Sequence, residues 1–476
     1  MKSKSSSWLK LAGNWIRANA LNVWLVAVFI CGLTAIFMIP PIYGNDEIVH
    51  FPRAYQVSRG TFWTQKFSDH DYGGYVPREL KEFNDGFREQ VQNNNPDPNR
   101  LKELRQQYSK QKLETPDDTR LSFTSAGPYS PWSYFPAAFG MLIARIADLP
   151  IIWYVYLSRL SCFIFWLMLT YGVLRILPTG KLFMASLALL PPAYVQASTI
   201  GMDGVVNGVS WLIIALTIAV LARTIKFTKG LFGLMVFLAF FLATTKQGYL
   251  LIAAFPLIIP ASFYPYSGRK ALKVRVGFSL ALALITMWYI SVTGPIASIL
   301  HFVQRPGLHV DSLDQIAYIL TNPFEVLLTI LITPLTVAYA GVYAGLVGVL
   351  TNKLLYLPIA VIVLLYVALG VALLNFKRSK LLAKEGYRLE WCSAGVLIGT
   401  FILSNLALYI AFTKVGNPVI EGFQGRYLLP LAPLLIALRP ELPGPAARFI
   451  RTYSAGFIAI VMLAGFASTV LALSRL

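Results

Sequence analysis

The 476-residue chain is poor in charge, since only 13% of its residues are Asp, Glu, Lys or Arg. A soluble globular domain carries about 25% charged residues, so about half of the charge expected of a water-exposed protein is missing. Hydrophobic residues make up 56% of the chain, and they fall into runs of the length that crosses a bilayer as a helix. These features exclude a soluble fold, an outer-membrane barrel with alternating strands and a disordered chain.

Cysteine is also scarce. The chain holds three, Cys31, Cys162 and Cys392, and each lies inside an apolar run. We therefore expect neither a disulfide framework nor a metal site built from cysteines.

Acidic residues are few outside one segment. Residues 40–133 contain 13 acidic and 12 basic residues, which leaves 9 of the 22 acidic and 29 of the 41 basic residues for the rest of the chain. Most of these basic residues form short clusters between apolar runs, and short basic loops beside membrane helices stay cytoplasmic. The net charge of +19 therefore indicates which loops lie on the cytoplasmic side of the membrane. It does not indicate a nucleic-acid partner, because no cluster has interleaved aromatic residues or a recognisable binding module.

The pattern predicts an all-α polytopic membrane protein with about 11–13 transmembrane helices. Residues 1–20 form a cytoplasmic basic tail, 21–39 the first transmembrane helix, 40–150 an extracytoplasmic loop with interfacial helices, and 151–476 a multi-helix transmembrane domain. Predicted crossings in that last domain include 182–200, 247–264, 354–376 and 426–438. Residues 323–351 fit either a hairpin of two crossings or a helix on the outer surface, which accounts for the range in the helix number.

The large loop begins with a polar helix. Asp46, His50 and Arg53 are spaced by four and three residues and therefore form one stripe on that helix, with Glu47 beside it. A capped surface helix with ordinary side-chain pairing explains the same pattern. Further on, we expect helices over 78–92 and 99–112, and an aromatic-rich amphipathic helix lying in the membrane interface over about 129–145.

Several more polar residues fall at the outer ends of predicted crossings, namely Asp203, Lys246 and the element Gln424-Gly425-Arg426-Tyr427. Charges at a membrane boundary are costly, so they are candidates for function. Plainer interpretations remain open, since Lys246 can extend its amine to the membrane surface and Asp203 can cap a helix.

Such a set suits one kind of chemistry. A carboxylate can take a proton from an attacking hydroxyl group, and nearby Lys and Arg can bind a departing phosphate. A lipid-facing groove can hold an isoprenoid tail. These parts describe group transfer from a polyprenyl phosphate, and the chain has no Gly-x-x-x-x-Gly-Lys-Ser/Thr loop for a nucleotide.

The same motifs resemble a known family. The elements are Asp46-Glu47-x-x-His50-x-x-Arg53-Ala54-Tyr55, Ser130-Pro131, Asp203 with Asn207, and Gln424-Gly425-Arg426-Tyr427-Leu428-Leu429-Pro430. Over nearly its whole length the sequence resembles the bacterial membrane family called domain of unknown function 2142, and through it the type-C (GT-C) glycosyltransferases. This resemblance implies a GT-C-like helical bundle and a polyprenyl-phosphate-sugar donor.

The resemblance also implies roles for individual residues. Asp46 becomes the catalytic base, with Glu47 assisting it or holding a divalent ion. Lys246 and Arg426 become the clamp for the donor phosphate, and Arg53 is a third phosphate-binding candidate. The supporting residues are then His50, Asp203, Gln424 and Tyr427.

We therefore expect a glycosyltransferase of the bacterial inner membrane that moves a sugar from undecaprenyl phosphate to a periplasmic glycan or lipid-linked acceptor. Its partners are that donor, the acceptor and the lipid bilayer. The cofactor is open, with Mg²⁺ or Mn²⁺ as candidates and Asp46, Glu47, Asp203 and His50 as available ligands. Two alternatives are a polymerase or ligase of lipid-linked glycans, and a transporter or flippase for lipids or polysaccharides.

Overall fold

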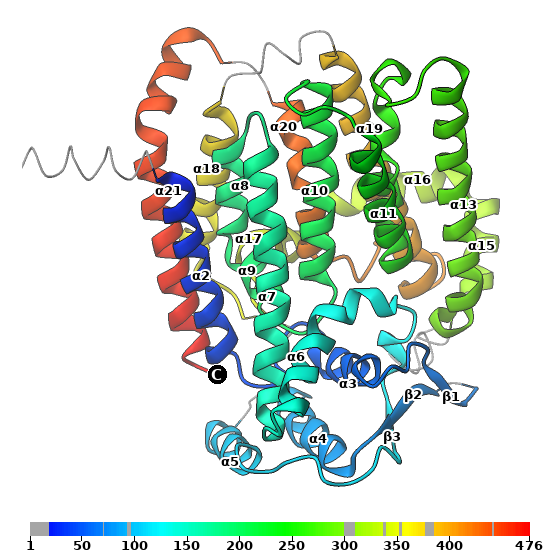
Figure 1. The fold of residues 1–476 in the computed structure, drawn as a ribbon, viewed down its shortest axis with the longest axis vertical. Helices are drawn as coiled ribbons and strands as arrows, with labels where there is room; N and C mark the ends of the chain where they lie inside the picture. The colour runs from blue at the N-terminus through cyan, green and yellow to red at the C-terminus, as the bar shows by residue number, and fades with distance from the viewer. Residues whose placement is uncertain are drawn as a thin grey trace, which may run out of the picture.

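The computed structural model describes residues 19–69, 71–92, 97–298, 310–336, 339–351, 355–376, 385–439 and 442–476. Most of the predicted basic tail over residues 1–20 lies outside these ranges. The described chain forms a bundle of roughly parallel and antiparallel helices (Figure 1). The elements from α3 (Glu47–Ser58) through α6 (Phe135–Ile146), which we call the cap, gather at one end of this bundle (Figure 1).

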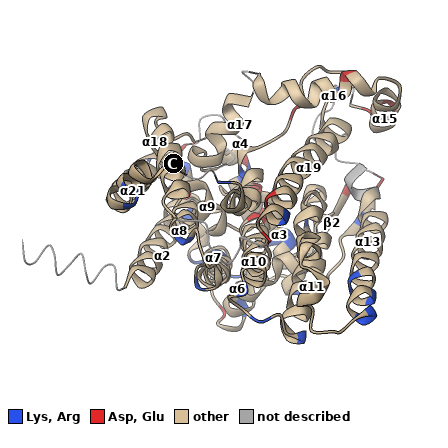
Figure 2. Cartoon of the chain, turned by 90° about the horizontal axis from the view of Figure 1, so that it is seen from above, with Lys and Arg blue, Asp and Glu red and all other residues tan. Residues whose placement is uncertain are grey.

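Within the described residues, six helices are long and apolar enough to cross a membrane, or up to seven if a bent pair counts as one span. Most of the length of these helices carries no charged residue (Figure 2). The prediction of an all-α polytopic membrane protein is thereby confirmed. The six are α2 (Ala20–Met38), α7 (Ile151–Ile176), α10 (Asp203–Leu221), α13 (Arg269–Ser298), α19 (Gly386–Phe412) and α21 (Gly444–Leu473).

Fewer helices are full-length than the 11–13 predicted crossings, because prolines break several apolar runs. Proline lacks a backbone N–H group and its ring clashes with the preceding turn of a helix. The predicted crossing over 182–200 is split before Pro191, and those over 247–264 and 426–438 become mostly 3₁₀ turns with internal prolines. The elements are α8 (Lys181–Ala188), α9 (Pro191–Ala197), η3 (Gln247–Tyr249), α12 (Leu250–Ala253), η4 (Phe255–Ile258), η5 (Ala261–Phe263), η9 (Gly425–Leu434) and α20 (Leu435–Leu438).

Two other predicted crossings are single but shorter helices, α11 (Lys229–Thr245) and α18 (Ile359–Leu374). The segment 323–351, predicted as a hairpin or a surface helix, instead contains short pieces: α16 (Pro323–Ile332), η6 (Thr333–Leu335) and α17 (Ala340–Gly348). Helix α15 (Ser312–Thr321) meets the α16–η6 segment at 104°, the angle of a broken span or a re-entrant loop.

Helix α10 is the centre of the bundle, with 94% of its most apolar window buried. It is apolar on all sides, as a helix must be when neighbours surround it. Helices α7 and α11 and segment η9 pack on it, and the indole Nε1 of Trp211 donates a hydrogen bond of 2.8 Å to the Leu429 carbonyl in η9. Segment η9 is thus held beside α10 although the two are far apart in the sequence.

The cap is mixed in structure. Helix α4 (Arg78–Gln92) confirms the predicted range, and the helix predicted over 99–112 is α5 (Pro98–Tyr108). The predicted interfacial helix consists of η2 (Pro131–Tyr134) and α6 (Phe135–Ile146), whose exposed side chains include Phe135, Phe139 and Ile146. The remaining elements are α3 (Glu47–Ser58), η1 (Thr124–Ala126), and three antiparallel strands in the order β1-β2-β3, namely β1 (Gln65–Ser68), β2 (Asp71–Val76) and β3 (Thr119–Ser122).

A buried ion pair joins the cap to the bundle. The Arg159 guanidinium of α7 lies 2.5 Å from a Glu47 carboxylate oxygen, and both side chains are 0% exposed. The same guanidinium donates to the carbonyls of Ile36, Ile39 and Pro40, where α2 ends. The Glu47 carboxylate also accepts hydrogen bonds from the backbone N–H groups of Gly44 and Ile200. We call Glu47, Arg159 and these backbone partners the clasp.

The clasp fixes four chain segments relative to one another: the end of α2, the start of α3, the middle of α7 and the loop that enters α10. Removing one partner of a buried ion pair leaves an uncompensated charge in a site that water does not reach. The position of the neighbouring Asp46 therefore depends on this pair.

We predict that Arg159→Gln lowers the free energy of unfolding by about 3–5 kcal/mol, the cost of leaving a buried charge unpaired. Thermal unfolding of the detergent-solubilised protein measures the effect. Arg175→Gln is the matched control, because Arg175 lies on the same helix but is exposed. Equal unfolding temperatures for the two variants would show that the clasp does not hold the fold.

Candidate functional site

Four charged side chains from distant parts of the chain meet where the cap joins the bundle. The Arg426 guanidinium lies 2.7 Å from an Asp46 carboxylate oxygen, across 380 residues of sequence. Its Nε lies 3.2 Å from an Asp203 oxygen, and the Lys246 amine lies 3.0 Å from the other Asp203 oxygen. We call Asp46, Asp203, Lys246 and Arg426 the charge cluster. The structure thus brings together all four of these predicted site residues.

Each member of the charge cluster stands at the end of an element. Asp203 begins α10, Lys246 directly follows α11, and Arg426 is the second residue of η9. The Arg426 side chain is held among α10, α17 and the cap and is only 9% exposed. A 19-residue helix is about 28 Å long, so the basic residues that follow α10, beginning with Arg223, lie at the opposite end of the bundle.

Asp46 differs from the other three in exposure and backbone conformation. Its side chain is 51% exposed, against 21% for Asp203. Its backbone is left-handed, with φ 55° and ψ 15°, and its side chain makes no capping hydrogen bond to α3. Asp tolerates this conformation better than most residues. The conformation turns the carboxylate away from the helix end and toward Arg426.

The cluster pairs two carboxylates with two cations, so its formal charges cancel. The Lys246 amine also lies 4.4 Å from the centroid of the Tyr427 ring, a cation–π contact that helps to hold it. Tyr249 donates a hydrogen bond of 2.9 Å to the Tyr427 carbonyl, which ties the chain after α11 to η9. Tyr427, which the family resemblance names as a supporting residue, therefore lies in contact with the cluster.

His50 lies buried beside the cluster. Its Nδ1 is 2.7 Å from the Tyr134 hydroxyl group of η2. Burial lowers the pKa of His50 below its ordinary value of 6.5, although the negative charges of Asp46 and Asp203 act in the opposite direction. Burial likewise raises the pKa of Tyr129, whose ring is next to His50, to about 12. We infer that His50 is neutral at pH 7 and that its hydrogen bond with Tyr134 orients the tyrosine ring.

Two predicted site residues lie apart from the cluster. Glu47, predicted to assist catalysis or to hold an ion, is fully buried and its oxygens are used by the clasp. Its role is to position Asp46, because no reactant can reach it without breaking the ion pair. Arg53, predicted to bind phosphate, is 1% exposed and donates to the Gln56 side chain and the Phe62 carbonyl. It stabilises the cap.

No three His, Cys, Asp or Glu side chains within the described ranges converge on a point that suits a metal ion. Of the four candidate ligands, Glu47 belongs to the clasp, Asp46 and Asp203 are paired with cations, and His50 bonds to Tyr134. The described residues as they stand do not form a divalent cation site.

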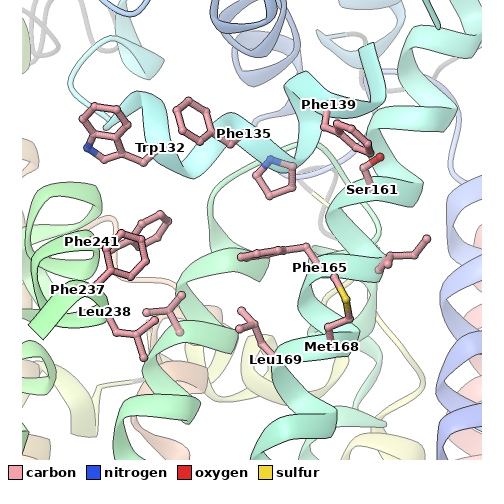
Figure 3. A pocket seen from close by; sticks show the side chains of 13 residues that line it. Trp132, Phe135, Phe139, Ser161, Phe165, Met168, Leu169, Phe237, Leu238 and Phe241 are labelled. Carbon is pink, nitrogen blue, oxygen red and sulfur yellow. The ribbon is translucent and has the colours of Figure 1, made fainter. Parts of the chain in front are cut away.

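The structure has two hollows in this region, and Arg426 of the charge cluster lines the smaller one. A cavity of about 280 Å³ is lined by Asn45, Gln424, Arg426, helix α17 and the residues Val349, Thr351 and Tyr356. A larger groove of about 460 Å³ runs between η2 and α6 on one side and α7, α10 and α11 on the other. Trp132 and Phe135 face Phe237 and Phe241 across it (Figure 3). This groove is almost wholly apolar. Gln424, by contrast, lines the smaller cavity, and its side chain is exposed there.

The groove runs close to the cluster along two helices. Val209, in its wall, lies six residues after Asp203 on α10, and Phe241 lies five residues before Lys246. At 1.5 Å per helical residue these separations are about 9 Å and 8 Å along the helix axes. Along α10 and α11 the groove and the cluster are therefore separated by fewer than two helical turns.

Sequence reasoning missed Arg159, although its signal was present. Arg159 is an arginine inside an apolar run that is long enough to cross a membrane, and such a charge needs a partner. It also missed Tyr134 and Tyr129, which carry no signal in a single sequence because a tyrosine at a membrane interface is common.

The fold and the charge cluster define a multi-pass membrane protein with a charged site at one end of its helical bundle. More particularly, the chain belongs to the family described as "Predicted membrane protein (DUF2142)", which matches residues 29–435. No curated protein and no solved structure matches the chain.

We predict that stability falls with acid more steeply in the wild type than in His50→Gln. The pKa of His50 is below 6.5 in the folded state, so below that pH the unfolded chain binds more protons and the free energy of unfolding decreases. Unfolding temperatures measured between about pH 7.5 and 5.5 test this. Parallel curves for the two proteins would contradict a buried neutral His50.

Proposed function

We propose that the protein is a glycosyltransferase that moves a sugar from a polyprenyl phosphate to a hydroxyl group of a glycan or lipid-linked acceptor. The observation that carries the proposal is the charge cluster, in which a half-exposed carboxylate stands beside a guanidinium and an amine. Helices α10 and α11, which carry Asp203 and lead into Lys246, also line an apolar groove. The family's description names no activity, so the proposal rests on this arrangement and on the resemblance to type-C enzymes.

The groove supports the choice of a lipid donor. Its walls are aromatic and aliphatic, and several lining side chains are exposed at the membrane-facing surface of the bundle, including Phe139, Met168 and Phe237. Water would surround these side chains at a large free-energy cost, whereas a lipid chain matches them. An isoprenoid tail lying there would carry its phosphate toward Lys246 and Arg426.

In the proposed reaction the acceptor hydroxyl oxygen attacks the anomeric carbon of the sugar, and the bond from that carbon to the phosphate oxygen breaks. The polyprenyl phosphate leaves with the electron pair of that bond. Asp46 takes the hydroxyl proton, since it is the most exposed carboxylate of the cluster. Arg426 and Lys246 stabilise the negative charge that grows on the leaving phosphate.

The cluster is neutral before the donor arrives. The phosphate must therefore share the cations with Asp46 and Asp203. When Arg426 turns toward the phosphate, it leaves the Asp46 carboxylate to accept a hydrogen bond from the acceptor hydroxyl group.

The proposal places the cap and the cluster outside the cytoplasm, in a bacterial inner membrane with the N-terminus inside. The end of α10 and the start of α13, beside which basic residues follow in the sequence, lie at the end of the bundle opposite the cap (Figure 1). Basic loops favour the cytoplasmic face, which supports this orientation.

We predict that the wild type releases undecaprenyl phosphate from an undecaprenyl-phosphate hexose when a surface-glycan extract is added, and that Asp46→Asn lowers the rate by at least about 100-fold. The amide keeps the shape of the side chain but cannot take the proton. Asp118→Asn, a change of the same kind at an exposed position in the cap, is the matched control. Wild-type turnover by folded Asp46→Asn would remove Asp46 as the base.

We predict that Arg426→Gln weakens binding of undecaprenyl phosphate by about 10- to 100-fold, the effect of losing a charge-assisted hydrogen bond. Binding to the protein in nanodiscs measures the change, with Arg448→Gln on the exposed start of α21 as control. If Arg426→Gln binds the lipid phosphate as tightly as the wild type does, Arg426 is not part of a phosphate site.

A further inference from the structure

The smaller cavity has a polar side chain without a partner. Thr351 lines this cavity of about 280 Å³ and is 1% exposed. No described residue forms a hydrogen bond with its hydroxyl oxygen. Buried hydroxyl groups in folded proteins almost always have a partner, because leaving one unpaired costs free energy. Among the described residues, this hydroxyl group is a hydrogen-bonding group on the cavity wall that a ligand can use.

Glycines create the space. Gly341 and Gly345 are four residues apart on α17, so they lie on the same face of that helix, and both line the cavity. Opposite them, Gly425 packs so tightly that an added Cβ would lie 2.0 Å from the Val342 carbonyl oxygen. The chain therefore brings η9 and α17 into direct backbone contact at Gly425 and keeps a hollow beside that contact.

Part of the cavity wall comes from two chain segments that pair with each other, one on each side of residues 352–354. Val349 and Tyr356 pair as an antiparallel bridge, and the Leu350 N–H donates to the Leu355 carbonyl. This pairing fixes Thr351 and Tyr356 at the cavity wall. Asn45 and Gln424 add amide groups, which both donate and accept hydrogen bonds.

Among the described lining residues, the one charged side chain is Arg426, and it already pairs with Asp46 and Asp203. The cavity therefore offers hydroxyl and amide groups with some apolar wall, including Phe423 and Val349, but no unpaired charge. Its volume lies just below the range of about 300–1,000 Å³ for drug-sized ligands. A compact, uncharged ligand with several hydroxyl groups fits this description.

We propose that the cavity binds one neutral monosaccharide ring, the sugar carried by the donor phosphate, with Thr351, Asn45 and Gln424 as its hydrogen-bonding groups. This inference deepens the proposed transferase and rests on it, because Arg426 joins the cavity to the charge cluster. Sugars that carry a carboxylate are excluded, since Asp46 would repel them and no cation remains to pair with them.

The test compares lipid phosphates with and without a sugar, using the full chain in nanodiscs. The probes are undecaprenyl phosphate, its neutral glucosyl, galactosyl and mannosyl forms, and its glucuronosyl form. We expect at least one neutral form to bind more tightly than the bare lipid phosphate, and the glucuronosyl form to bind no more tightly. A preference for the glucuronosyl form would overturn the proposal.

Two variants test whether the gain in affinity from the sugar arises in this cavity. Thr351→Val keeps the side-chain shape without the hydroxyl group and should reduce the gain by about 3- to 10-fold, the effect of one hydrogen bond. Gly341→Leu should abolish it by filling the cavity. An added Cβ at Gly341 meets nothing closer than the Tyr356 hydroxyl at 3.8 Å, so this variant has room to fold.

Gly395→Leu is the matched control, because Gly395 is also helical and an added Cβ there meets nothing within 4 Å. All three variants should bind bare undecaprenyl phosphate as the wild type does. If Thr351→Val and Gly341→Leu keep the full gain, or lose affinity for the bare lipid equally, the cavity is not the sugar site.

A second readout separates this proposal from the transferase. Saturation-transfer nuclear magnetic resonance detects weak binding of methyl glucoside, galactoside and mannoside without any lipid. If the wild type binds no lipid phosphate, the transferase fails, but a saturation signal that Gly341→Leu removes would still support a sugar cavity. Absence of both the lipid-linked gain and this signal would overturn the cavity assignment.

Discussion

The buried ion pair between Glu47 and Arg159 is the interaction on which the candidate site depends. Two fully buried charges are tolerated in this fold because each is also saturated by backbone groups, carbonyls around the arginine and N–H groups around the glutamate. Arg159 binds the carbonyl groups at the end of α2, and Glu47, the first residue of α3, binds the loop before α10. Asp46 and Asp203, which lie next to these fixed points in sequence, are therefore placed within reach of one arginine.

This arrangement separates the roles of two adjacent acids. Glu47 faces inward and is inaccessible, whereas Asp46, with its left-handed backbone, faces the charge cluster and is half exposed. A residue in a rarely populated backbone conformation persists when the surrounding structure holds it there. At Asp46 the clasp is that surrounding structure. One carboxylate supplies stability, and the other remains available for chemistry.

The sequence predicts the class of fold and much of the site, for identifiable reasons. Apolar runs and basic clusters follow from the membrane as solvent, and charged residues at the ends of these runs identify Asp46, Asp203, Lys246 and Arg426. Among the described residues, fewer helices are continuous and full-length than there are predicted crossings, because hydropathy does not distinguish a continuous helix from a run that Pro191, Pro256 or Pro430 interrupts. The three-stranded sheet of the cap was also missed, since its strands are at most six residues long.

Contacts between distant segments account for the other differences. Helical spacing alone places Glu47 and Arg53 beside Asp46 and His50, but it cannot reveal that Arg159 lies opposite Glu47 or that Gln56 and the Phe62 carbonyl hold Arg53. Likewise, the cavity beside Arg426 arises from α17 packing on η9, about 80 residues further along the chain. Such partners are set by tertiary packing.

The most direct test of this account compares Asp46→Asn with Glu47→Gln by thermal unfolding of the purified protein. Only the Glu47 change alters the clasp, so the account predicts a large fall in unfolding temperature for Glu47→Gln and a value near the wild type for Asp46→Asn. Equal stability of the two variants, or a larger loss in Asp46→Asn, would contradict the division between a structural and an available carboxylate.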